Sequence, residues 1–151
     1  MQIRQIKVDD DLTELFDEWL KECRANSFDL EASVVEACKD IKTLNDNRAV
    51  FVMIEEGKII GLLGVDINKS PIGPEMIANE HFFYVIPKYR GQGLQMIRTA
   101  EKWLKDKTQC THFILNASYL ASDLAPRVIR MYGLLGYSRF EVSMIKKLGG
   151  K

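Results

Sequence analysis

The stretch from Glu80 to Leu94, EHFFYVIPKYRGQGL, constrains the fold more than any other part of the sequence. Its first half, Glu80 to Val85, is rich in aromatic residues, and Pro87 lacks the N–H that a sheet ladder needs, so the pattern predicts a strand that ends before the proline. Arg90 to Gly93 then open a segment of helical periodicity. Glycines at the start of a helix let backbone N–H groups approach an anion, which the helix dipole also favours. The stretch therefore predicts a strand, a turn and a helix N-terminus suited to a phosphate.

Residues at set spacing around these glycines resemble the acetyl-coenzyme A signature of the GNAT superfamily of N-acetyltransferases. The family pattern is Arg or Gln, two residues, Gly, any residue, then Gly or Ala, and Lys88, Gly91 and Gly93 occupy those places. Lys88 departs from the usual first residue but keeps a cation there. A dinucleotide-binding turn fits less well, because Met96 stands where G-x-G-x-x-G requires a third glycine.

Composition and charge narrow the class of protein. With 151 residues, 46% of them apolar, the chain suits a single domain spanning residues 1–151. Its 21 basic and 21 acidic residues cancel, so no net field draws it onto nucleic acid or an anionic membrane. No apolar run approaches the ~18 residues of a membrane span, and the N-terminus lacks the pattern of a secretory leader. We therefore expect a cytoplasmic protein without nucleic-acid or membrane partners.

The cysteines and other reactive residues indicate neither a metal site nor a hydrolase. Cys23, Cys38 and Cys110 lack metal-ligand spacing, and we expect them to be reduced and packed. No Ser/His/Asp arrangement, HExxH motif or calcium loop is present. No cysteine stands at a position suited to covalent transfer of a group.

Hydrophobic periodicity predicts the order strand, two helices, three strands, helix, strand, helix, strand. The expected elements are a strand over 1–8, helices over 12–23 and 30–44, strands over 49–54 and 58–65 joined by a hairpin, a central strand over 78–85 after a mobile loop at 68–74, a helix ending near 107, a strand over 113–117, a helix over 123–135, and a final strand or hairpin over 138–147. This is the element order of the GNAT fold. The resemblance implies an α/β (α+β) domain with a mixed, largely antiparallel central sheet, about four flanking helices, and a splay between the central strand and the next.

A second local motif supports the resemblance. Tyr132, three residues, Gly136 and Tyr137 match the family's Tyr, three residues, Gly, then Phe or Tyr. Where the family often has Asn seven residues before that tyrosine, this chain has Ala125, which removes one side-chain contact to coenzyme A. The glutamate and aromatic residues before the glycine turn, and the close of the chain at Glu141 to Leu148, also resemble the short GNAT-type proteins of tailed bacteriophages.

The resemblance implies an acetyl-coenzyme A site along the central strand and the glycine turn. In the family, the splay after a bulge exposes backbone N–H groups of the central strand to the pantetheine and thioester, and the glycine turn holds the pyrophosphate. The cofactor-binding residues implied here are Phe83, Tyr84, Val85, Lys88, Tyr89, Arg90, Gly91, Gln92, Gly93 and Leu94.

Three residues are candidates for catalysis. Glu80 is the candidate general base, because family members often carry a catalytic glutamate at this place and apolar neighbours would raise its pKa; an exposed or salt-bridged carboxylate is the alternative. Strand alternation directs His81 to the opposite face, where it is the second candidate base or a structural histidine. Tyr132 either protonates the leaving thiolate or is a core tyrosine.

Two functions fit these residues. The first is an N-acetyltransferase that moves an acetyl group from acetyl-CoA to a primary amine by direct attack in a ternary complex. The second is a GNAT-fold module that binds coenzyme A or serves a structural, virion-associated role without turnover, which Lys88 and Ala125 favour. The acceptor, a small-molecule or protein amine, would be selected by residues 26–29 and 68–74, and neither segment carries the dense acidic cluster of a polyamine or aminoglycoside site. Whether the chain forms a homodimer stays open.

Overall fold

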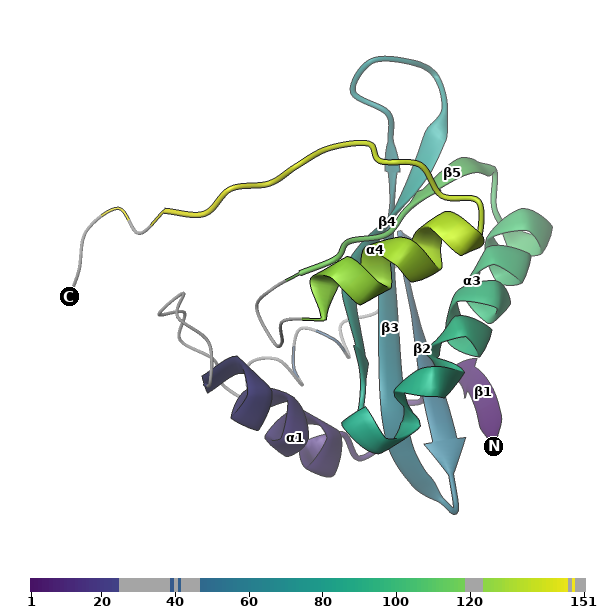
Figure 1. Cartoon of the computed structure of the whole chain (residues 1–151). Coiled ribbons are helices and arrows are strands. Elements are labelled where there is room, and N and C mark those ends of the chain that lie inside the picture. The colour runs from purple at the N-terminus through teal and green to yellow at the C-terminus, as the bar shows by residue number, and fades with distance from the viewer. Residues whose placement is uncertain (25–38, 40, 42–46, 119–123, 147, 149–151) are drawn as a thin grey trace.

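A five-stranded sheet forms the centre of the molecule in the computed structural model, which describes residues 1–24, 39, 41, 47–118, 124–146 and 148. The elements are β1 (Gln2–Gln5), α1 (Thr13–Arg24), β2 (Arg48–Glu55), β3 (Lys58–Lys69), β4 (Met76–Val85), the 3-10 helix η1 (Pro87–Gln92), α3 (Gly93–Lys107), β5 (Cys110–Ile114) and α4 (Ala125–Leu134). The strands lie in chain order, antiparallel from β1 to β4, and β5 pairs with β4 in parallel (Figure 1). The expected mixed, largely antiparallel sheet is confirmed.

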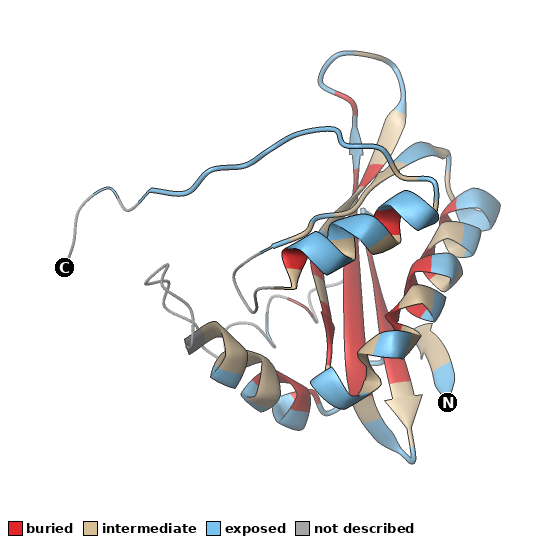
Figure 2. Cartoon of the chain, viewed as in Figure 1, coloured by how far each residue is buried: buried red, intermediate tan, exposed pale blue. Residues whose placement is uncertain are grey.

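Strands β2 and β3 are buried on both faces, so the core consists of two layers, one on each side of the sheet (Figure 2). On one face, Phe51 and Leu63 pack with Met96 and Ala100 of α3. On the other, alternate residues of the same strands pack with the apolar side of α1, as Val52 does with Phe16. Because successive strand residues point to opposite faces, each helix has its own half of the core.

Local turn chemistry ends two elements where the sequence predicts. Glu56 and Gly57 both have positive φ, 49° and 78°, and form the two-residue loop between β2 and β3. Such loops match the twist of an antiparallel pair and favour glycine. Gly136 has φ +91°, and this left-handed residue ends α4.

Several predicted boundaries are wrong. β3 continues to Lys69 rather than ending at Val65, because its polar residues pair with the first half of β4. β5 spans Cys110–Ile114 rather than 113–117, so Asn116 lies beyond the strand. The predicted helix over 30–44 lies outside the described residues except for Lys39 and Ile41. The described α-helices are therefore three, where the sequence predicts about four for the whole chain.

The predicted final strand over 138–147 is also wrong for the residues that the structure describes there. Residues 138–146 form no strand, and the segment runs as an extended tail away from α4 (Figure 1). The alternation that predicts the strand is present, but Phe140, Val142 and Met144 are 71, 81 and 90% exposed. Alternation of apolar and polar residues allows a segment to form a strand, but a strand forms only where a neighbouring strand pairs with it.

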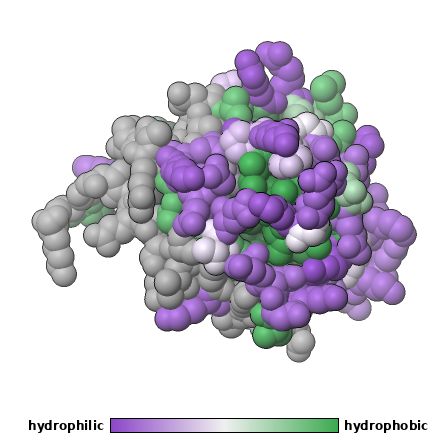
Figure 3. Space-filling view, turned by 90° about the horizontal axis from the view of Figure 1, so that it is seen from below, coloured by the Kyte–Doolittle hydropathy of each residue, from purple (hydrophilic) through white to green (hydrophobic). Residues whose placement is uncertain are grey.

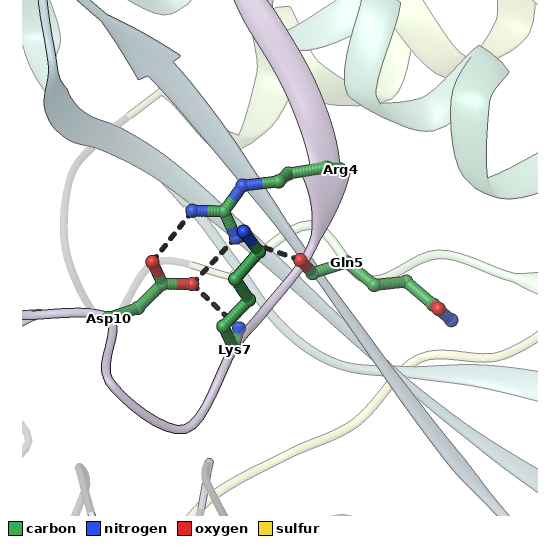
Figure 4. A network of polar contacts seen from close by, with 4 residues as sticks. All are labelled: Arg4, Gln5, Lys7 and Asp10. Carbon is green, nitrogen blue, oxygen red and sulfur yellow. Dashed lines mark hydrogen bonds and ion pairs between the residues drawn. The ribbon is translucent and has the colours of Figure 1, made fainter.

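Polar contacts hold the beginning of the chain in place. Arg4 of β1 donates two hydrogen bonds to the carboxylate of Asp10, each 2.7 Å long, and the same carboxylate accepts a 2.7 Å bond from the backbone N–H of Lys7 (Figure 4). Because of this pairing with Arg4, the pKa of Asp10 lies below its usual range. These contacts fix the turn that leads into α1 and thus the position of that helix on the sheet.

The surface carries mixed charge, in keeping with a net charge of zero. Seen from below, hydrophilic side chains cover most of the surface formed by the described residues, and an apolar area is visible between them (Figure 3). In the described part of the chain, no helix is both long enough and apolar enough to cross a membrane.

Candidate active site

A bulge in β4 sets the geometry of the site. Gly64 pairs with Phe82 and Val65 with Glu80, so His81 is an extra residue on β4. A Cβ atom at position 64 would lie 2.1 Å from the Phe82 ring, so glycine leaves room for that ring beside the bulge. Bulges interrupt the alternation of side chains. The prediction that His81 points away from Glu80 nevertheless agrees with the contacts, because Glu80 lies opposite Val65 whereas His81 contacts Asp66, the next residue of β3, whose side chain points to the other face. Both residues line the same cavity.

The predicted splay between β4 and β5 is confirmed. Their pairing ends at Asn79 and Ile114, six residues before β4 itself ends at Val85. The backbone N–H of Ile86 donates to the carbonyl of Ile60, and the antiparallel alternation of bonds leaves the amides of Phe83 and Val85 facing away from β3. The second half of β4 thus presents backbone groups along an open edge.

A cavity of about 870 Å³ surrounds this open edge. Its wall is built by β4, α1, α4, the start of α3 and the chain after β5. The described lining residues are Trp19, Ile41, Glu80, His81, Phe82, Phe83, Tyr84, Val85, Pro87, Arg90, Gly93, Asn116, Ala117, Ser118, Leu124, Arg127, Val128, Met131 and Tyr132. All three predicted catalytic residues line the cavity. Five of the predicted cofactor-binding residues also line it, namely Phe83, Tyr84, Val85, Arg90 and Gly93. The other five, Lys88, Tyr89, Gly91, Gln92 and Leu94, are not among the lining residues.

The carboxyl group of Glu80 is held by the chain beyond β5. It accepts a 2.8 Å hydrogen bond from the backbone N–H of Asn116, and the side-chain amide of Asn116 donates to the backbone carbonyl of Glu80 at 3.0 Å. The residue is half-buried because the cavity opens on it, yet the carboxyl lies deep among protein atoms. This burial raises the pKa of Glu80 to about 7, although the bond from Asn116 acts in the opposite direction.

Tyr132 is linked to Glu80 through the same asparagine. The tyrosine residue is 6% exposed, and its hydroxyl donates a 3.1 Å hydrogen bond to the backbone carbonyl of Asn116. Burial, and then the negative charge of Glu80, raise the pKa of Tyr132 above its ordinary value. The phenol therefore keeps its proton at physiological pH. The candidate acid and the candidate base face one cavity and share one neighbour.

The motif that begins at Tyr132 also has a structural role. The backbone N–H of Tyr137 donates to the carbonyl of Tyr132 at 3.0 Å, across the left-handed Gly136. The hydroxyl of Tyr137 donates to Glu101 of α3 at 2.6 Å, and its ring meets Phe113 of β5 edge to face. The end of α4 is thereby fixed against α3 and β5, which positions Tyr132 over the cavity.

His81 belongs to a charged group on the β3 side of the bulge. Its Nδ1 lies 2.9 Å from a carboxylate oxygen of Asp66, whose other oxygen accepts a 2.6 Å hydrogen bond from Arg48. The imidazole also meets the Phe82 ring edge to face. The carboxylate of Asp66 thus orients the imidazole at the edge of the cavity.

The glycine turn forms η1 and the start of α3. A Cβ atom at Gly91 would meet no atom within 4 Å, whereas one at Gly93 would lie 3.2 Å from the ring of Phe83. Gly93 therefore permits close packing of α3 on β4, and Gly91 leaves the turn open to an approaching group. The ammonium of Lys88 lies 5.2 Å from the centre of the Tyr89 ring.

Arg90 makes strong contacts within the protein. Its guanidinium donates to both carboxylate oxygens of Glu22 on α1 at 2.5 Å, and its Nε donates to the carbonyl of Val85 at 3.2 Å. Glu22 also accepts a 2.7 Å bond from the hydroxyl of Tyr84. These contacts occupy the guanidinium of Arg90 with a carboxylate of the protein itself. None of them involves a backbone N–H group of the turn.

Sequence reasoning misses Asn116 and Glu22, because each is a single polar residue without a motif. Asn116 lies inside a predicted strand, and Glu22 lies on the polar side of a predicted helix. What marks them is a contact in space, from Asn116 to Glu80 and from Glu22 to Arg90, and such contacts are visible only in the tertiary structure.

Comparison with known proteins identifies the family of the chain. Residues 10–137 match the model of the acetyltransferase (GNAT) family. The chain belongs to this family. GNAT acetyltransferases generally use acetyl-CoA as the acetyl donor. No curated protein sequence matches the chain.

Solved structures share the GNAT fold over almost the whole chain. A transcriptional regulator from Bacillus halodurans has a TM-score of 0.75 at 21% identity, covering 97% of this chain and 99% of that one. A ribosomal-protein-alanine N-acetyltransferase from Brucella melitensis biovar Abortus has a TM-score of 0.73 at 12% identity, with coverages of 98 and 100%. A glucosamine-6-phosphate N-acetyltransferase from Arabidopsis thaliana has a TM-score of 0.67 at 18% identity, covering 98% of each chain. At these identities the similarity shows a common fold.

Proposed function

We propose that this GNAT protein transfers the acetyl group of acetyl-CoA to a primary amine by direct attack within a ternary complex. The observation that carries this proposal is the position of Glu80. Its carboxyl, with a pKa of about 7, faces the cavity at the point where β4 leaves β5. A general base works best when its pKa is near the working pH, because it is then deprotonated often enough and still basic.

The residues present fit acetyl-CoA. The outward-facing amides of Phe83 and Val85 would bind the pantetheine as a neighbouring strand would, and Gly91 leaves the turn open for a pyrophosphate at the start of α3. Bound acetyl-CoA supplies an acetyl group activated as a thioester.

Glu80 removes a proton from the acceptor. With a pKa of about 7, about half of these carboxyl groups are ionised at neutral pH. The hydrogen bond from Asn116 fixes the carboxylate, so that it meets the amine in one orientation. His81 lines the same cavity and is the second candidate for this step.

Tyr132 donates a proton to the departing thiolate. Its raised pKa keeps the hydroxyl protonated. In the structure this proton is donated to the carbonyl of Asn116, so the hydroxyl turns from that carbonyl toward the cavity when it protonates the thiolate. A covalent acetyl-cysteine route gains no support from the described cysteines. Neither Cys23 nor Cys110 is a lining residue, and Cys38 lies outside the described residues.

Release of free thiol from acetyl-CoA tests the proposal. The full chain is incubated with acetyl-CoA and a panel of small primary amines and short peptides, and thiol formation is followed with a chromogenic disulfide. Amine-dependent release, with the acetylated amine detected by mass spectrometry, would support transfer. Binding of coenzyme A without release for any amine would instead support a cofactor-binding module that lacks turnover.

A further inference from the structure

Helix α1 contributes an aromatic wall to the cavity. Trp19 lines the cavity and stacks on Tyr84 of β4, with ring centres 5.3 Å apart and planes inclined by 7°. It also stacks on Phe16, with ring centres 5.6 Å apart, and the ring of Phe82 lies 6.5 Å away. Trp19 is half-buried, so part of its surface remains for a ligand. We refer to Trp19, Phe82 and Tyr84 as the aromatic wall.

The aromatic wall is held rigidly. The hydroxyl of Tyr84 donates a 2.7 Å hydrogen bond to Glu22, which lies one turn after Trp19 on the same helix. Glu22 in turn binds the guanidinium of Arg90, which lies 5.8 Å from the centre of the Tyr84 ring. Rings held in this way lose little freedom when a ligand binds, which favours affinity.

The wall lies next to the candidate base. Phe82 follows Glu80 and His81 directly in the bulge, and all three line the cavity. An amine that reaches Glu80 thus occupies the same cavity as the aromatic wall. Aromatic rings pack favourably against other aromatic or apolar groups.

The charges around the cavity disfavour an acceptor with several ammonium groups. Glu80 is the one carboxyl group among the described lining residues, and its raised pKa leaves it partly neutral near pH 7. Arg90 and Arg127 line the same cavity, and the guanidinium of Arg90 is paired with Glu22. Among the described lining residues, a polyamine or aminoglycoside would meet only one carboxyl group, and that group is the candidate base.

We infer that the acceptor is an amine with a single positive charge on an aromatic or apolar body, as in an arylalkylamine, and that Trp19 determines this preference. The inference rests on the proposed function and specifies its substrate class. Trp19 acts by binding the body of the acceptor.

Phenethylamine, kanamycin and spermidine are the probes for this inference. With acetyl-CoA and the full chain, we expect kcat/KM for phenethylamine to exceed that for kanamycin and spermidine at least about tenfold, a difference within reach of stacking and charge selection. A preference for kanamycin or spermidine would overturn the inference while leaving acetyl transfer intact.

Substitution of each tryptophan provides a matched comparison. Trp19→Leu keeps apolar volume but removes the ring, and we expect KM for phenethylamine to rise about tenfold with kcat within about twofold. Trp103→Phe is the control, because Trp103 packs against Phe51 on the opposite face of the sheet and does not line the cavity. An unchanged KM in a folded Trp19→Leu variant would contradict the role of the ring.

Fluorescence separates binding from chemistry. In the Trp103→Phe variant, Trp19 is the sole tryptophan, so phenethylamine added in the presence of coenzyme A should change its emission in a saturable way. Saturable binding without acetylation would support the substrate class and count against acetyl transfer. Absence of both binding and acetylation would overturn the inference, and circular dichroism of Trp19→Leu and Trp19→Phe identifies any variant that fails to fold.

Discussion

The backbone N–H of Asn116 donates a 2.8 Å hydrogen bond to the carboxylate of Glu80 and so joins β4 to the chain beyond β5 where the two strands stop pairing. The carbonyl of the same asparagine accepts the hydroxyl of Tyr132 at 3.1 Å. One peptide segment therefore positions both the candidate base and the candidate acid, which makes its integrity a test of the whole site.

Replacing the base should slow turnover without loss of the cofactor. We expect Glu80→Gln to lower kcat by roughly 10²-fold or more, the usual scale for a general base, while affinity for coenzyme A stays the same. In the wild type, kcat/KM should rise with pH through about 7, because the carboxyl must be ionised to accept a proton. Rate profiles between pH 5 and 9 for both proteins check this. A wild-type rate in the glutamine variant would assign the step to His81 or water.

Glu80 should also make stability depend on pH. Its pKa is raised from 4.5 to about 7 on folding, so the folded state holds this proton more tightly than the unfolded state. The associated stability is fully present below the unfolded pKa and is lost as pH rises through about 7. Relative to Glu80→Gln, the wild type should therefore melt at lower temperature at pH 8 than at pH 5. A difference in Tm that does not vary with pH would contradict the buried carboxyl.

Two substitutions at Asn116 separate its backbone from its side chain. Asn116→Pro removes the N–H that lowers the pKa of Glu80, so the rising limb of the rate profile should move to higher pH. Asn116→Ala keeps the N–H and loses only the 3.0 Å amide bond to the backbone of Glu80, so its profile should stay near that of the wild type. Equal shifts in both variants would show that the N–H is not the controlling group. Thermal melts establish that each variant is folded.

The hydroxyl of Tyr132 can be removed while its ring is kept. If Tyr132 is the acid, Tyr132→Phe should lower kcat by about tenfold or more and cost about 1 kcal/mol of stability for the bond to Asn116. Since the pKa of Tyr132 is raised, the tyrosine itself should cause no fall in rate below about pH 10. Kinetics and denaturant unfolding of the same preparation measure both quantities. Normal turnover with reduced stability would leave the hydroxyl a purely structural role.

The glycine turn offers a direct test of cofactor binding. A Cβ at Gly91 meets nothing within 4 Å, so Gly91→Glu should fold with a Tm close to that of the wild type. Its bulk and negative charge should nevertheless abolish binding of coenzyme A at the turn, as measured by calorimetry. Gly133→Glu is the matched control, because its Cβ also has open space and it lies outside the cavity lining. Unimpaired binding by Gly91→Glu would place the pyrophosphate elsewhere.

Features that depend on neighbouring residues in the chain could be predicted from the sequence. The strand, turn and helix between Glu80 and Leu94 follow from aromatic content, Pro87 and the glycines. The hairpin at Gly57 and the end of α4 at Gly136 follow from the ease with which glycine adopts positive φ. Together with the spacing that resembles GNAT proteins, these local signals were enough to predict the sheet and its splay.

The arrangement of the site was decided only by tertiary structure, because it depends on contacts between residues far apart in sequence. Glu80 and Asn116 are 36 residues apart, and Arg90 and Glu22 are 68 apart. The bulge at His81 arises from the register between β3 and β4, which no local pattern in either strand specifies. The apolar alternation after α4 likewise predicts a strand, yet residues 138–146 are not paired in the structure. Alternation describes one strand, whereas register and pairing are properties of two, and a single stretch of sequence contains no information about the second.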